Sequence, residues 1–213
     1  QTTDYRHLEQ LMARGIPVVF FDRIPDMPNI DCVVDNNYKI GYEAVRHLYD
    51  QGCRKIAHYA GPQTLLEYRN RLAGYQQALL DFGLEYREEY VVYDSITMNT
   101  GIEATKYLLQ LPNRPDAIFS AGDYAAITAM DTIKKQGLSI PDDIAVVGIA
   151  NEPFVNYLDP ALSSFDLHNR KMGEEAASML LERMNKESNY PQGEKLVFEP
   201  ELIVRASSLK KHS

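Results

Sequence analysis

Strand-sized apolar runs alternate with helix-like segments along nearly the whole chain. The runs are rich in β-branched and aromatic residues and occupy 17–21, 32–34, 55–59, 90–93, 117–119 and 144–149. Between them, apolar residues recur at helical spacing, as in Ile40, Ala44 and Leu48. This alternation predicts an α/β fold in which parallel strands are joined by right-handed crossovers.

Short segments that contain polar residues or glycine directly follow the apolar runs. They occupy 22–23, 35–36, 60–62, 94–95, 120–123 and 150–152. Sheets of parallel strands bind their ligands beyond the carboxyl ends of the strands. A single polar residue in such a place is more often a helix cap. Because the pattern repeats after six runs, it predicts a ligand site at one edge of the sheet.

Composition narrows the class of partner. The chain of 213 residues carries 22 Lys and Arg against 30 Asp and Glu, a formal charge of −8, which argues against broad binding to phosphate backbones or anionic lipid. Any contact with nucleic acid is therefore expected from another segment. No apolar stretch is long enough for a membrane span, and the first residues do not resemble an export signal. Cys32 and Cys53 lack metal or disulfide spacing and are expected to be free thiols in a reducing compartment.

The motifs of common catalytic sites are absent from the sequence. There is no GxSxG elbow, phosphate-binding P-loop or GxGxxG turn, and the five histidines lack the spacing of metal ligands. His47 falls in an expected helix and His58 in an expected strand, where each is predicted to be a packed or half-exposed side chain rather than a ligand. We therefore expect no cofactor, no metal site and no enzymatic activity.

Six ordered segments carry a resemblance to a known family. In chain order they are Asp22, Gly61-Pro62, RLAGY at 71–75, PDDIAVVG at 141–148, PALSS at 160–164 and ELIVRASS at 201–208. Together they resemble the effector-binding core of lac/purine repressor-type bacterial transcription regulators, over essentially the whole chain. The closing ELIVRASS is typical of the repressors rather than of periplasmic sugar-binding proteins with the same fold.

The resemblance implies a two-lobed, periplasmic-binding-protein-like fold with parallel sheets and three chain crossings. Residues 1–35 with 167–198 are expected to form a partial N-terminal lobe. Residues 36–166 with 199–213 are expected to form a complete C-terminal lobe. A DNA-binding head and the first strands of the N-terminal lobe would precede Gln1, so the chain is expected to be a truncated form.

The resemblance also implies which residues bind the effector. Asp22 matches an acidic position that contacts sugar hydroxyls, and Arg71 matches the arginine that most often grips the effector. Further expected site residues are Ile96, Asp123, Ala150 and Asn151, of which Asp123 is also expected to cap its helix. In relatives an aspartate often follows the sixth strand, whereas here Ala150 precedes Asn151 and moves the polar group by one residue.

The function implied is that of the ligand-sensing domain of a cytoplasmic transcriptional regulator. A small effector, expected to be a sugar or sugar derivative, would bind between the lobes and modulate operator binding by the missing head. The expected partners are this effector, operator DNA through the head only, and a second copy in a homodimer, with no membrane. The alternative is a periplasmic sugar-binding receptor of a transport system, and an enzyme is a further rival without a supporting motif.

Overall fold

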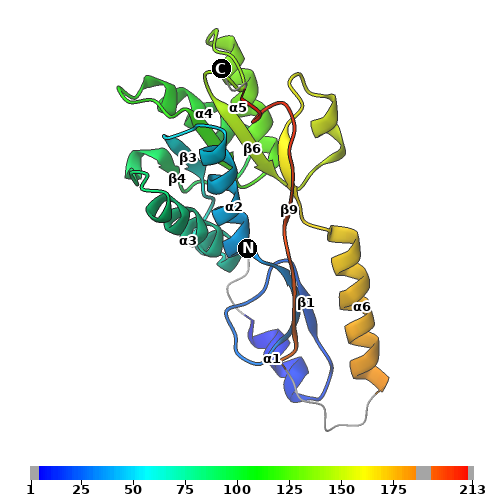
Figure 1. Ribbon diagram of the computed structural model, residues 1–213. Coiled ribbons are helices and arrows are strands. Elements are labelled where there is room, and N and C mark those ends of the chain that lie inside the picture. Colours follow the sequence, from blue (N-terminus) through cyan, green and yellow to red (C-terminus); the bar gives the residue numbers. More distant parts are fainter. Residues whose placement is uncertain (1–4, 186–192, 211–213) are drawn as a thin grey trace. The chain divides into compact units, whose positions relative to one another are not determined.

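The computed structural model describes residues 5–185 and 193–210 of the chain. The chain divides into two compact units (Figure 1). Unit 1 comprises Gln1–Asn36 and His168–Glu199, and unit 2 comprises Asn37–Leu167 and Pro200–Ser213. The chain thus passes between the units three times, and we call these places the first, second and third crossings.

Unit 2 is built on one sheet. Within the described residues its strands follow the spatial order β4-β3-β5-β6-β7-β9. Their bounds are β3 Ile56–Tyr59, β4 Val91–Val92, β5 Ala117–Ser120, β6 Ala145–Ile149, β7 Ser163–Asp166 and β9 Glu201–Ile203. The strands from β4 to β7 are parallel, with His58 opposite Phe119 and Val147 opposite Ser163. The carboxyl ends of these strands therefore lie along the same edge of the sheet.

Helices cover both faces of this sheet. They are α2 Asn37–Asp50, α3 Leu66–Asp81, α4 Met98–Gln110 and α5 Asp123–Lys135, with short 3-10 helices at Glu88–Tyr90 and Pro153–Tyr157. Phe119 and Val147 pack with apolar residues of α2 and α3, whereas Ile118 and Val146 pack with those of α4 and α5. Successive strand residues point to opposite faces, and both faces are buried. This burial explains why the strands are continuous apolar runs.

Unit 1 has a smaller sheet. In the described part of the chain its strand order is β1-β2-β8, all parallel, with β1 Val19–Phe21, β2 Asp31–Asp35, β8 Lys195–Phe198 and the helices α1 Arg6–Ala13 and α6 Asn169–Asn185. Cys32 and Val34 pack in a cluster with Leu8 of α1, whereas Val33 packs with Met172 of α6. Successive residues of β2 thus face different helices.

A buried ion pair ties α6 to β2. Arg183 donates from Nε and Nη2 to the two carboxylate oxygens of Asp31, at 2.6 and 2.8 Å. The backbone N–H groups of Gly193 and Glu194 donate to the same carboxylate. Burial by itself raises the pKa of Asp31, but these donors and the charge of Arg183 hold the pKa below its usual value. The carboxylate is therefore ionised and holds the C-terminal end of α6 against β2.

The α/β class predicted from the sequence is confirmed, and each of the six apolar runs contains a strand. One feature differs from the expected parallel arrangement, because β9 pairs antiparallel with β7. β7 ends at Asp166, just before the second crossing, whereas β9 begins at Glu201, just after the third. The end of β7 and the start of β9 therefore lie at the same edge of the sheet, where Asp166 is opposite Glu201. Because β9 starts where β7 ends, the two strands run in opposite directions.

Two glycines allow α2 and α3 to meet backbone against backbone (Figure 1). A Cβ atom at Gly41 would lie 2.0 Å from the carbonyl oxygen of Arg71, and one at Gly74 would lie 1.9 Å from that of Tyr38. Neither neighbour is the end of a flexible side chain, so any larger residue would separate the helices. The position of Arg71 relative to the start of α2 depends on this contact.

We expect the Gly74→Ala substitution to destabilise unit 2, because the added methyl overlaps backbone atoms. The free energy of unfolding should fall by about 1 to 3 kcal/mol or more, measured by urea denaturation. Gly173 is the matched control, since it lies within α6 and a Cβ there meets nothing within 4 Å. Gly173→Ala should stabilise the chain by about 0.5 to 1 kcal/mol. Equal effects of the two substitutions would contradict the role of the glycine contact.

Candidate ligand-binding site

Residues at the ends of several strands have an unusual backbone. Asp22 follows β1 with φ of 60°, and Ala150 and Asn151 follow β6 with φ of 115° and 48°. Positive φ is costly for residues other than glycine and tends to occur at binding sites, where surrounding contacts hold the chain in place. The strand ends that the sequence marks as polar are thus also places of local strain.

Arg71 is buried in the second turn of α3, with only 5% of its surface exposed. Its Nε donates to Oδ1 of Asn37 at 2.7 Å, and the guanidinium carbon lies 5.4 Å from the ring centre of Tyr68. Asn37 is the first residue of α2 and also the first residue after the first crossing. The guanidinium is therefore oriented by a residue that adjoins a crossing.

His58 lies near Arg71 in the buried layer beneath α3. Its ring stacks on Phe119 at 4.4 Å between ring centres, and Nδ1 donates to the carbonyl oxygen of Phe119 at 3.0 Å. Burial, assisted by the charge of Arg71, lowers the pKa of His58 to about 3. The imidazole is therefore neutral and adds no second positive charge beside Arg71. The prediction that His58 is a packed side chain is confirmed.

Asp123 does not cap α5 as expected, because the helix begins at this residue with Gly122 in the cap position. Its carboxylate instead joins the ends of two strands. One oxygen accepts the backbone N–H of Glu152 at 2.9 Å, and the other accepts the hydroxyl of Ser164 at 2.7 Å. Burial raises the pKa of Asp123 to about 6, in spite of these two donors. Sequence reasoning missed this role, since neither donor adjoins Asp123 in the chain.

Asn151 is fixed by a small polar network. Its side-chain amide donates to Asp166 at 3.1 Å and accepts from Arg205 at 2.8 Å, while its backbone N–H donates to Ser164 at 3.0 Å. Arg205 also donates to the carbonyl oxygen of Leu162 at 2.8 Å. Ser164 is therefore shared by Asp123 and Asn151, which brings these two predicted residues together. Arg205 was not predicted as a site residue, although an arginine in the apolar closing segment is a signal of such a role.

The remaining predicted residues occupy different surroundings. Ile96 follows β4, is half-buried and lies over Gly122, where an added Cβ would come within 2.8 Å of its side chain. Ala150 is held at its backbone, where its N–H donates to the carbonyl oxygen of Phe165. Asp22 is half-buried in unit 1 and donates its backbone N–H to Val33. Five of the six predicted residues thus belong to unit 2 and Asp22 belongs to unit 1.

Across residues 5–185 and 193–210, no cluster of three or more His, Cys, Asp or Glu side chains is arranged to hold a metal ion. None of the helices in these ranges is both long and apolar enough to cross a bilayer. Cys32 and Cys53 are both buried free thiols.

Comparison with known proteins identifies the family. The model of the periplasmic binding protein-like domain matches residues 45–208. The chain belongs to this family. Its resemblance to lac/purine-type regulators is also confirmed by individual relatives. It is 33% identical over 201 residues to the HTH-type transcriptional regulator CelR of Thermobifida fusca and 32% identical over 204 residues to the HTH-type transcriptional repressor PurR of Photobacterium profundum.

These matches cover most of this chain but only part of each relative. They include 93% and 94% of the chain, against 58% of the CelR relative and 60% of the PurR relative. The chain thus spans about three fifths of the length of these curated relatives. Among solved structures, a transcriptional regulator CelR–cellobiose complex is 33% identical and has a TM-score of 0.86, with 94% of this chain and 61% of that chain covered. The periplasmic-binding-protein-like fold expected for the chain is confirmed.

The pKa of Asp123 predicts a specific pH dependence of stability. An unfolded Asp ionises near pH 3.8, whereas folded Asp123 stays protonated until about pH 6. Its contribution to stability is therefore fully present below pH 3.8 and is lost as the pH rises to 6. The loss should be about 3 kcal/mol in total, or about 1.4 kcal/mol per pH unit. Urea unfolding of the wild type and Asp123→Asn across this range should show the additional slope in the wild type only. Parallel pH profiles would contradict the assignment.

Proposed function

We propose that the chain is the ligand-sensing part of a cytoplasmic, DNA-binding transcriptional regulator. The observation that carries this proposal is the buried Arg71, which is hydrogen-bonded to Asn37 next to the first crossing. A ligand bound to Arg71 would therefore contact a residue that is linked to the connection between the units. The regulators among the relatives support this function over a transport receptor. The proposal assigns no catalytic role to the chain.

The proposed effector is a carbohydrate or a sugar derivative. The planar fork of an arginine binds a pair of sugar hydroxyls or a carboxylate through two parallel hydrogen bonds. The proposal places Arg71, Ile96, Asp123, Ala150 and Asn151 at the effector on unit 2. It assigns Asp22 of unit 1 the contact with hydroxyl groups. Cellobiose, the ligand named with the similar CelR structure, is the first candidate to test.

Regulation would follow from the three crossings. An effector that binds one arrangement of the units better than another shifts the population between them. A coupling free energy of about 1 to 3 kcal/mol changes the affinity for a second ligand by roughly 5- to 150-fold. The second ligand in this proposal is operator DNA, bound by a head outside this chain. The charge of −8 supports this division, because the chain itself is unsuited to bind phosphate backbones.

The proposal includes a homodimer that pairs through unit 2. Apolar and aromatic side chains are exposed at the starts of α4 and α5 and in the 3-10 helix at Pro153–Tyr157; they are Met98 at 54%, Tyr124 at 51% and Tyr157 at 89%. Tyr124 lies 5.2 Å from Phe154 between ring centres, and Thr128 of α5 donates to the carbonyl oxygen of Met98. Tyrosine and methionine are enriched in protein interfaces, so we assign this surface to a second copy.

The first test removes the guanidinium. Arg71→Ala should weaken effector binding roughly 10- to 150-fold, since a hydrogen bond to a charged group contributes about 1.5 to 3 kcal/mol. Calorimetric titration with cellobiose and related sugars measures this loss, and circular dichroism checks that the variant is folded. Arg69→Ala is the matched control, because Arg69 lies on the same helix but is exposed. Unchanged affinity in a folded Arg71→Ala protein would contradict the proposed site.

The second test concerns the dimer. Tyr157→Ser should raise the dissociation constant for self-association at least tenfold, because tyrosines that become buried in an interface often contribute much of its binding energy. Analytical ultracentrifugation measures the constant. Leu80→Ser is the control, since Leu80 is 72% exposed but lies on α3, away from the proposed surface. A wild-type monomer at high concentration, or the same loss in both variants, would rule out this interface.

A further inference from the structure

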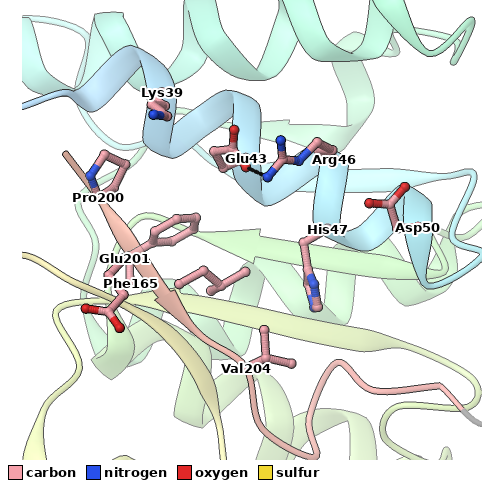
Figure 2. A pocket seen from close by; sticks show the side chains of 10 residues that line it. Lys39, Glu43, Arg46, His47, Asp50, Phe165, Pro200, Glu201 and Val204 are labelled. Carbon is pink, nitrogen blue, oxygen red and sulfur yellow. Dashed lines mark ion pairs between the residues drawn. The ribbon is translucent and has the colours of Figure 1, made fainter.

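A cavity of about 530 Å³ lies on unit 2 between α2 and β9. It is lined by Lys39, Glu43, Arg46, His47, Asp50, Phe165, Pro200, Glu201, Leu202 and Val204 (Figure 2). None of the six predicted effector residues is among these lining residues. The volume falls within the range of cavities that hold small molecules. The cavity is therefore separate from the proposed effector site.

The cavity is bordered by residues that adjoin all three crossings. Lys39 lies three residues after Asn36, where the first crossing occurs. Phe165 lies two residues before the second crossing, and Pro200 is the first residue after the third. The cavity is therefore lined by residues that lie within three positions of each crossing.

The floor and the wall of the cavity differ in chemistry. Leu202 of β9 and Val204, which follows β9, form an apolar floor, and the buried Phe165 of β7 lies beneath it opposite Leu202. Figure 2 shows Val204 and Phe165 beside the charged residues of α2. One face of a sugar ring is apolar and packs well on such a surface. The wall is the charged face of α2, where Glu43 and Arg46 form an ion pair.

The charges of the residues that line the cavity nearly balance. Three carboxylates and two basic side chains line the cavity, and both signs occur along α2. Burial lowers the pKa of His47, whose Nε2 lies 2.7 Å from the hydroxyl oxygen of Ser208, so the ring is neutral at neutral pH. An anion would meet the carboxylates and a cation would meet Lys39 and Arg46. An uncharged molecule with many hydroxyl groups meets both donors and acceptors without such repulsion.

We propose that this cavity binds an uncharged mono- or disaccharide as a second, modulating ligand. The ring would pack on Leu202 and Val204 while its hydroxyls pair with Glu43 and Arg46. Because the cavity adjoins the crossings, the bound sugar stabilises one arrangement of the units and changes the affinity of the effector site. Linkage requires that the effector change the affinity of this cavity by the same factor. The binding stands independently, and only the coupling rests on the proposed function.

Nuclear magnetic resonance can separate the two sites. In a titration of the ¹⁵N-labelled chain with glucose and with cellobiose, we expect saturable shifts at amides of β9 and of residues 43–50 in α2, away from Asn37, which contacts Arg71. These shifts should remain in the Arg71→Ala variant, which lacks the proposed effector contact. Shifts at the strand ends alone would overturn the cavity while leaving the proposed function intact. Shifts at α2 and β9 alone would support the cavity and count against the effector site.

Matched variants test the contacts within the cavity. Val204→Trp should fill the space and abolish the α2 and β9 shifts. Glu43→Gln should lower the affinity measured from these shifts about tenfold or more, since it removes a charged acceptor. Glu103→Gln is the control, because Glu103 forms an ion pair at the same helical spacing on α4, outside the cavity. Shifts that persist unchanged in both cavity variants would overturn the proposal. Tighter binding of glucose 6-phosphate than of glucose would also overturn it, because the ligand class would be wrong.

Discussion

The direct backbone contact between α2 and α3 is the constraint on which the candidate site depends. Gly41 and Gly74 remove the side chains that would otherwise separate the helices. As a result Asn37, at the start of α2, lies within hydrogen-bonding distance of Arg71 on α3. A buried guanidinium needs such partners, because an unsatisfied charge in the interior is very costly. The helix contact therefore sets both the burial and the orientation of the arginine.

A second constraint acts at the other side of the same sheet edge. Asp123 and Ser164 connect the start of α5 to β7, and Asn151 joins this connection through Ser164. Arg205, in the segment after β9, donates a further hydrogen bond to the side chain of Asn151. The loop after β6 keeps its positive φ angles because these contacts stabilise it. Polar residues at these strand ends thus fix the loops that carry them.

The family relationship and the geometry inform different questions. Relatives that cover the chain almost completely are transcriptional regulators, which identifies the type of protein in which this domain occurs. The cavity between α2 and β9 follows from the geometry of unit 2 alone. Its residues come from α2 and from two strands, β7 and β9. The residues of α2 lie more than 100 positions before those of the strands, as with Glu43 and Leu202. The proposed effector site and the proposed second site therefore rest on separate parts of unit 2.

The sequence by itself determined the α/β class, the positions of six strands and the polar character of their carboxyl ends. These features are local, because burial on both faces requires continuous apolar runs and each run must end in residues that can turn. The resemblance to known regulators selected Asp22 and Arg71, but periodicity could not show what either residue contacts. Only the tertiary structure decided that Arg71 pairs with Asn37, that Asp123 bonds to Glu152 and Ser164 rather than capping its helix, and that β9 runs antiparallel. The physical reason is that each of these features joins residues distant in sequence, and packing of whole elements brings them together.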